Sequence, residues 1–173
     1  MVNERISVII VDDEEMLLDT IKSGLSSEGY HCETASTVKS AIELVSRTPF
    51  EIMITDVILP DGHGFELAKK AMGLTPGLKV ILITGYSEDF SYDEAMEAGA
   101  SDFIKKPFSL KELLARIKHI RMQDELLRNE EELRKKVAEL QEFYDLAVGR
   151  ELRMVELKKE IETLTEELQK HKK

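Results

Sequence analysis

Short apolar runs alternate with amphipathic stretches through the first two thirds of the chain. The strand-like runs lie at about residues 6–11, 31–35, 51–55, 79–83 and 101–105. The first, third and fourth runs are apolar without alternation, which is typical of strands buried on both faces of a sheet. The run at 31–35 alternates polar and apolar residues, and this pattern indicates an edge strand.

The stretches between these runs carry apolar residues at helical spacing. Helices are expected near residues 14–28, 37–47, 64–73 and 88–97, and a fifth is expected to begin near residue 109. Ser36 or Thr37 is the expected N-cap of the second helix, and Ser109 is that of the fifth. The strict alternation of strand and helix predicts an α/β domain with a parallel sheet.

From about residue 118 the composition becomes typical of a long helix. No proline follows residue 107, and Gly149 is the only glycine after residue 99. Two heptad seams of apolar residues follow, out of phase by a three-residue step near Gly149. The first seam comprises Leu126, Leu133, Val137, Leu140, Tyr144 and Ala147, and the second comprises Leu157, Ile161, Leu164 and Leu168. We expect residues 121–173 to form a helical coiled-coil extension, in preference to a single helix docked on the domain.

The net charge of −10 is unevenly distributed along the chain. Residues 1–117 carry a net charge of −9, whereas residues 118–173 carry 13 Lys and Arg against 14 Asp and Glu. Acidic charge keeps a domain soluble and disfavours contact with nucleic acid. Because the tail has no basic patch either, no nucleic-acid partner is expected.

Cysteine content and hydropathy favour a cytoplasmic protein. Cys32 is the only cysteine, so no intrachain disulfide can form. The N-terminus lacks a basic stretch followed by a long apolar segment. No apolar run approaches the roughly 20 residues needed to span a bilayer. We therefore expect a cytoplasmic location and no membrane contact.

Polar side chains that can carry chemistry stand at the ends of four expected strands. Asp12 and Asp13 end the first run, Asp56 ends the third, Thr84 ends the fourth, and Lys106 follows the fifth. The carboxyl ends of parallel strands meet at one edge of a sheet, so these groups are expected in one crevice. Neighbouring carboxylates repel one another unless a cation lies among them, and Mg²⁺ prefers such oxygen ligands. The pattern predicts a site that binds Mg²⁺ and accepts a phosphoryl group on Asp56.

Other residues of the crevice suit a bound phosphate. Lys106 offers a positive charge and Thr84 a hydroxyl donor, while the glycine-rich loop 57–64 offers backbone N–H groups. Ordinary structural roles are the alternative: Asp12 and Asp13 can cap the first helix, and Asp56 can simply end a strand. The occurrence of all these residues in register at strand ends favours the functional interpretation.

Taken together, these motifs resemble the receiver domain of two-component response regulators over about residues 5–120. The resemblance is carried by Asp12-Asp13, by the stretch from Asp56 to Gly64 (DVILPDGHG), by Thr84-Gly85 and by Lys106-Pro107-Phe108. It implies a flavodoxin-like, doubly wound, five-stranded parallel sheet with the strand order 2-1-3-4-5. It also implies a receiver domain at residues 1–120, followed by the coiled-coil extension at 121–173.

The resemblance implies roles for the metal and phosphate ligands. Asp56 receives phosphate from a sensor histidine kinase or from a small phosphodonor, and Lys106 binds that phosphate. Asp13, Asp56 and the carbonyl of Ile58 are the implied direct ligands of Mg²⁺, whereas Asp12 acts mostly through water. The peptide bond between Lys106 and Pro107 is expected to be cis.

The resemblance also implies a switch. Thr84 turns toward the phosphate on activation, and the aromatic residue Phe103 packs inward behind it. Phe103 replaces the commoner tyrosine, so a hydroxyl readout is absent at that position. Ile58 and Tyr86 stand where the family tunes access of water to the phosphate, and their bulk implies slow hydrolysis.

Three functions fit these features to different degrees. The first is a signalling switch, not a turnover enzyme, in which phosphorylation of Asp56 acts on a tail that dimerises or reaches a downstream protein partner. The second is a phosphatase of the aspartyl-phosphate type, but such enzymes carry a second acid two residues after the nucleophile, where this chain has Ile58. The third is a structural coiled-coil adaptor with an inactive receiver, which the complete set of site residues disfavours.

Overall fold

The chain divides into two compact units, Met1–Met122 and Gln123–Lys173. The computed structural model describes residues 6–85 and 99–170, except for the side chains at 151–152 and 164–170. The first unit holds the sheet and its helices. The second consists of the C-terminal part of the long helix α5 (Leu110–Lys170).

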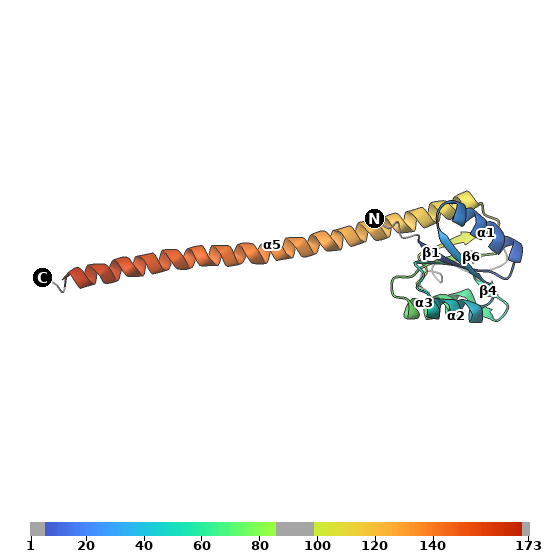
Figure 1. Cartoon of the computed structure of the whole chain (residues 1–173), viewed down its shortest axis with the longest axis horizontal. Helices are drawn as coiled ribbons and strands as arrows, with labels where there is room; N and C mark the ends of the chain where they lie inside the picture. Colours follow the sequence, from blue (N-terminus) through green and yellow to red (C-terminus); the bar gives the residue numbers. More distant parts are fainter. Residues whose placement is uncertain (1–5, 86–98, 171–173) are drawn as a thin grey trace. The chain divides into compact units, whose positions relative to one another are not determined.

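A five-stranded parallel sheet forms the centre of the first unit (Figure 1). Its strands are β1 (Ser7–Val11), β2 (His31–Ala35), β3 (Ile52–Asp56), β6 (Lys79–Thr84) and β7 (Asp102–Lys105), in the order β2-β1-β3-β6-β7. When only the sheet strands are numbered, this is the order 2-1-3-4-5, so the predicted doubly wound fold is confirmed. The order reverses at β1, and in such sheets ligands bind outside the strand ends at that point.

A short hairpin separates β3 from the next helix. Strands β4 (Ile58–Leu59) and β5 (Gly62–His63) pair antiparallel, with Ile58 opposite His63 and Leu59 opposite Gly62. The sequence indicated only a glycine-rich loop here, because two-residue strands are too short to show a period-two pattern. The hairpin begins two residues after Asp56, so it bears on the site described below.

Helices cover both faces of the sheet (Figure 1). Helix α1 (Glu15–Ser27) lies on one face, together with the first turns of α5, and α2 (Val38–Arg47) and α3 (Gly64–Leu74) lie on the other. The predicted N-caps are present: Thr37 Oγ1 accepts from Ser40 N–H at 3.1 Å, and Ser109 Oγ accepts from Glu112 N–H at 3.2 Å. The helix expected near 88–97 lies outside the described residues.

Alternate residues of each central strand enter opposite halves of the core. In β1, Val8 and Ile10 pack with the α1 and α5 side chains, whereas Ile9 and Val11 pack with those of α2 and α3. All four are completely buried. The sheet is therefore buried on both faces, as the continuous apolar runs predicted, and this burial fixes the register of the strand ends.

Helix α5 changes character along its 61 residues. Leu113, Ile117 and Ile120 are buried in the core of the first unit. In the second unit the large residues of the first heptad seam are 54–69 % exposed, and these are Leu126, Leu133, Val137, Leu140 and Tyr144. The predicted long helix is confirmed, and the coiled coil remains a prediction. Among the described residues, no helix has the length and apolar character needed to cross a membrane.

Candidate functional site

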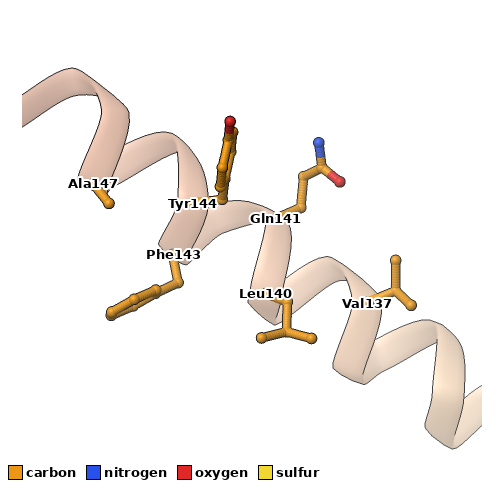
Figure 2. Close-up of a pocket in the computed structure, with 6 residues that line it drawn as sticks. All are labelled: Val137, Leu140, Gln141, Phe143, Tyr144 and Ala147. Atoms are coloured by element: carbon orange, nitrogen blue, oxygen red, sulfur yellow. The ribbon is translucent and has the colours of Figure 1, made fainter. Parts of the chain in front are cut away.

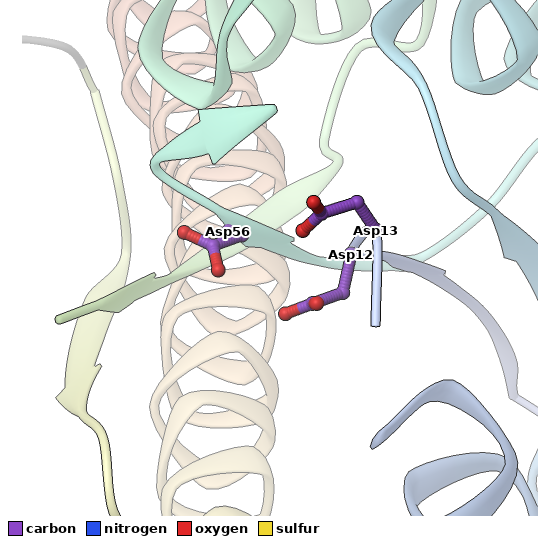
Figure 3. A group of neighbouring side chains, drawn as sticks. All are labelled: Asp12, Asp13 and Asp56. Atoms are coloured by element: carbon purple, nitrogen blue, oxygen red, sulfur yellow. The ribbon is translucent and has the colours of Figure 1, made fainter. Parts of the chain in front are cut away.

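Three carboxylates meet where β1 and β3 end (Figure 3). Each of Asp12, Asp13 and Asp56 offers an oxygen within 4.8 Å of those of the other two. Asp12 is completely buried and Asp56 is 8 % exposed, whereas Asp13 is exposed. The sequence prediction that these residues share one crevice is therefore matched by their positions.

A lysine at the end of β7 lies against this acidic group. Lys106 Nζ donates to Asp56 Oδ2 at 2.6 Å and to Asp12 Oδ2 at 2.9 Å. It also donates to Glu14 Oε1 at 3.2 Å. Lys105, its neighbour, is exposed. The Lys106–Pro107 peptide bond is cis, as expected.

The electrostatics of the site follow from burial and from this lysine. Burial raises the pKa of Asp12 above its ordinary value, although hydrogen bonds from Lys106 and from the Glu14 backbone oppose the shift. Burial alone lowers the pKa of Lys106, but its bonds to Asp56 and Asp12 outweigh burial and raise that pKa. Lys106 therefore remains charged and compensates two of the carboxylates.

Asp12 has a structural role as well as a place in the site. Its Oδ1 accepts from Glu14 N–H at 2.9 Å, at the start of α1, while its Oδ2 holds Lys106. Asp12 is not the N-cap of α1: that position is Glu14, whose side chain makes no capping hydrogen bond, so Asp12 holds the residue that precedes the helix. One carboxylate ties the end of β1, the start of α1 and the end of β7 together.

The backbone that follows Asp56 is packed closely against that residue. Ile58 N–H donates to Asp56 Oδ1 at 3.0 Å, and Gly64 N–H donates to the carbonyl of Val57 at 2.8 Å. A Cβ atom on Gly64 would collide with the carbonyl oxygen of Asp56. Gly64 is therefore required by a close approach of two backbone segments rather than by a positive φ.

The two expected switch residues lie on β6 and β7. Asp56 pairs with Ile83, so Thr84 follows at the same edge of the sheet, where it is 6 % exposed. Its carbonyl accepts from Lys106 N–H at 2.8 Å. Phe103 is partly buried against the core shared with α2 and α3. Of the two residues expected to tune access of water, Ile58 is 52 % exposed, and Tyr86 lies outside the described residues.

Two contributors to this region were missed by sequence reasoning. Glu14 is an exposed third acid beside the Asp12-Asp13 pair, and only its contact with Lys106 distinguishes it from a surface glutamate. Asp61 lies in the turn between β4 and β5, where an Asp-Gly pair is ordinary turn chemistry. Its carboxylate instead accepts hydrogen bonds from two N–H groups of α2.

The donor set fits a hard divalent cation. Mg²⁺ takes oxygen ligands, typically one or two carboxylates with the remainder supplied by water and phosphate. Asp13 and Asp56 offer such oxygens at a partly open edge, and Asp12 lies next to them. These residues are therefore suitable for holding Mg²⁺ beside the Asp56 carboxylate.

Comparison with known proteins identifies the family of the fold. Residues 8–118 match the family model described as the response regulator receiver domain. The chain belongs to this family. The receiver is also 35 % identical over 115 residues to the transcriptional regulatory protein CreB of Escherichia coli, a match that covers 66 % of this chain and 50 % of CreB. The response regulator SaeR of Staphylococcus epidermidis is 33 % identical over 113 residues, with 65 % and 49 % of the two chains covered.

Solved structures agree with this assignment. A CheY-like response regulator receiver domain protein from Methanospirillum hungatei superimposes with a TM-score of 0.66 at 35 % identity, covering 70 % of this chain and 98 % of that one. The beryllofluoride-activated NtrC4 receiver domain dimer gives a TM-score of 0.61 at 35 % identity, with 66 % and 94 % covered. The chain spans about half the length of the curated relatives it matches.

Proposed function

We propose that this receiver is a switch that is turned on when Asp56 accepts a phosphoryl group from a sensor histidine kinase. The observation that carries the proposal is the contact of Lys106 Nζ with Asp56 Oδ2 at 2.6 Å, inside a group of three carboxylates. A lysine held at that distance can move from the carboxylate to an incoming phosphate oxygen without a change of strand position. Because Asp56 is nearly buried, only phosphodonors that are small or well aligned can reach its carboxylate.

The proposed reaction is a direct transfer. One oxygen of the ionised Asp56 carboxylate forms a bond to phosphorus, and the bond from phosphorus to the histidine nitrogen of the kinase breaks with its electron pair on nitrogen. Lys106 neutralises charge on the phosphoryl oxygens, and the N–H of Ile58, already bonded to Asp56 Oδ1, keeps that carboxylate oriented. When bound by Asp13 and Asp56, Mg²⁺ supplies the further positive charge that three acidic side chains and a phosphate require.

The chemistry proposed here is modification of the chain itself rather than turnover. Ile58 stands two residues after Asp56, where a phosphatase of the aspartyl-phosphate type carries an acid. Its side chain has no proton to give to a leaving group. The phosphorylated state is therefore proposed to be an output state. The bulk of Ile58 and Tyr86 predicts that its hydrolysis is slow.

Thr84 and Phe103 are the residues proposed to change conformation first when Asp56 is phosphorylated. Thr84 lies at the end of β6, one residue beyond the partner of Asp56, and Phe103 lies on the neighbouring strand β7. A phosphate at Asp56 that draws Thr84 toward it leaves space that Phe103 can occupy. Helix α5 begins five residues after β7 ends and continues through the heptad seams, so the tail is the proposed recipient of the change.

The tail is proposed to pair with a second copy of the chain. Figure 2 shows Val137 and Tyr144 on one flank of α5 and Leu140 and Phe143 on the other. At 100° per residue these side chains form a stripe about 120° wide, which is the width of a buried helix face. With Leu126 and Leu133 of the first seam, these side chains are 54–73 % exposed, and a stripe of exposed apolar residues of this kind is the type of surface that a helix pair buries.

Charge does not oppose this pairing. Residues 118–173 carry nearly equal numbers of acidic and basic groups, and exposed ion pairs such as Glu132–Lys136 lie within the helix. An isolated helix of this length, with an exposed apolar stripe, gains little stability on its own. The NtrC4 receiver domain, 35 % identical, was solved as a beryllofluoride-activated dimer, which supports a link between activation and association.

Output through a protein partner is proposed in preference to direct contact with nucleic acid. CreB carries the name of a transcriptional regulator, but this chain matches only half of it. The sequence of the tail, with its balanced charge, has no basic recognition face.

Phosphorylation is tested by incubating the chain with acetyl phosphate and Mg²⁺ and weighing it by intact mass spectrometry. Wild-type protein should gain the mass of one phosphoryl group, and Asp56→Asn should gain none. The gain should also disappear when Mg²⁺ is removed by a chelator. A gain in both proteins, or in neither, would contradict the assignment of Asp56.

Dimerisation is tested by light scattering on two charge-changing variants of the tail. Leu140→Lys places a charge in the stripe and should yield monomers at concentrations where wild type is dimeric. Glu139→Lys makes an exposed change one residue away, outside the seam, and should leave the dimer intact. A monomeric wild type, or equal dissociation of both variants, would rule out pairing through this stripe.

A further inference from the structure

The turn between β4 and β5 is fastened to the start of α2 by one carboxylate. Asp61 Oδ1 accepts from Val38 N–H at 2.7 Å, and Asp61 Oδ2 accepts from Lys39 N–H at 3.0 Å. The same turn packs on Val38, because a Cβ atom on Gly62 would lie only 3.3 Å from Val38 Cγ2. Two independent contacts therefore hold the tip of the hairpin on the helix.

Asp61 accepts hydrogen bonds from the two backbone N–H groups of α2 that the local cap does not bind. The first backbone N–H groups of a helix have no partner within the helix. Thr37 and Ser40 satisfy each other reciprocally, since Thr37 Oγ1 accepts from Ser40 N–H and Ser40 Oγ accepts from Thr37 N–H. The N–H groups of Val38 and Lys39 remain, and these are the two that Asp61 binds from 22 or 23 residues away.

The other end of the hairpin reaches the phosphoryl-accepting residue. Ile58, the first residue of β4, donates its N–H to Asp56, and Gly64 packs its backbone on the Asp56 carbonyl. Between these anchors the hairpin has only two residue pairs. A hairpin of this size is not stable by itself in water, so its conformation depends on the contacts at its tip and base.

We propose that Asp61 is a positioning residue for the cation site, because it fixes the backbone of Ile58 by fastening the hairpin tip to α2. This inference rests on the proposed function, together with the Mg²⁺ ligand that the family resemblance implies at the Ile58 carbonyl. Asp61 itself touches neither the cation nor the phosphate. Loss of the Asp61 carboxylate releases the tip of the hairpin from α2 and lets the Ile58 backbone move. The Ile58 carbonyl is then no longer held in a fixed position for Mg²⁺.

The test compares Asp61→Ala with Thr37→Ala, a matched control that removes the local cap of the same helix. Mg²⁺ affinity is measured by NMR titration, and the amide exchange rate of Ile58 is measured in protein free of Mg²⁺. Asp61→Ala should raise the dissociation constant for Mg²⁺ by about three- to tenfold and speed exchange at Ile58. Thr37→Ala should lower the melting temperature but change the dissociation constant by less than about twofold.

Asp61→Asn gives a second, milder variant if Asp61→Ala fails to fold. It keeps one acceptor and should give an intermediate dissociation constant. Unchanged Mg²⁺ affinity and Ile58 exchange in both Asp61 variants would overturn the positioning role, as would an equal loss of affinity in Thr37→Ala. A wild-type chain that binds no Mg²⁺ would overturn the proposed function itself, and the inference with it.

Discussion

Replacement of Gly64 by alanine should damage the receiver, although the same change elsewhere in α3 should strengthen it. Gly64 is the first residue of α3, and a Cβ atom there would collide with the Asp56 carbonyl oxygen. It would also lie 3.0 Å from the Asp56 carbonyl carbon and 3.2 Å from Val57 Cα. All three neighbours are backbone atoms, so no side chain can rotate away, and β3 must shift relative to α3.

The magnitude follows from opposing effects. Insertion of a methyl group into a packed region costs about 1–3 kcal/mol, and here the strain falls on backbone. Alanine regains about 0.5–1 kcal/mol through its better helix propensity. Gly73, near the other end of α3, has no atom within 4 Å of an added Cβ. Gly73→Ala should therefore stabilise the unit by about 0.5–1 kcal/mol. Gly64→Ala should destabilise it by a net of about 0.5–2 kcal/mol, the strain less the gain in helix propensity.

Urea titrations followed by circular dichroism measure both effects as shifts of the unfolding midpoint. The two variants should move the midpoint in opposite directions. Because the strain falls on Asp56, Gly64→Ala should also slow phosphorylation by acetyl phosphate, and Gly73→Ala should not. A Gly64→Ala protein as stable as wild type would refute the close-packing argument.

Three further outcomes are expected. Hydrogen bonds from two N–H groups lower the pKa of Asp61 in the folded protein. The contribution of Asp61 to stability is therefore complete above its unfolded pKa of about 3.9 and is lost as the pH falls through the lower folded pKa. The urea midpoints at pH 5 and pH 3 should differ less in Asp61→Asn than in wild type. Removal of the Glu14 charge from Lys106 should speed phosphorylation by acetyl phosphate about two- to fivefold in Glu14→Gln, and the same result in Glu15→Gln would contradict a specific contact. Mg²⁺ at about 100 times its dissociation constant should stabilise wild type by about 2.7 kcal/mol in a thermal melt, and a similar gain in Asp13→Asn would exclude Asp13 as a ligand.

The fold was predictable because strand burial leaves a clear mark on a sequence. Runs such as Ile52–Asp56 are buried on both faces, so the positions before Asp56 are apolar apart from the buried Thr55. The β4–β5 hairpin left no such mark. Ile58 is half exposed and Leu59 is buried, and two pairs of residues are too few to establish a period.

The positions of the site residues were predictable where they depend on strand ends. Asp12, Asp56 and Lys106 come together because parallel strands finish at one edge, and that rule needs no knowledge of side-chain contacts. Glu14 and Asp61 could not be placed in this way. Each acts across the surface on a partner far away in sequence, and neither an exposed acid nor an Asp-Gly turn indicates which partner it will meet.

The strand register has a consequence for how chains of this design can vary in length. Val11 pairs with Thr55, Asp56 with Ile83, and Thr84 with Lys105, so the reactive residues depend on three adjoining alignments. Deletion of one residue inside β3 would turn Asp56 toward the opposite face and expose the apolar residues before it. Insertions and deletions should therefore be confined to connections such as residues 75–78, which precede β6 and lie at the opposite ends of the strands from the reactive residues. A library of single-residue deletions, sorted for folded protein, would show this as tolerance in those turns and intolerance within the strands.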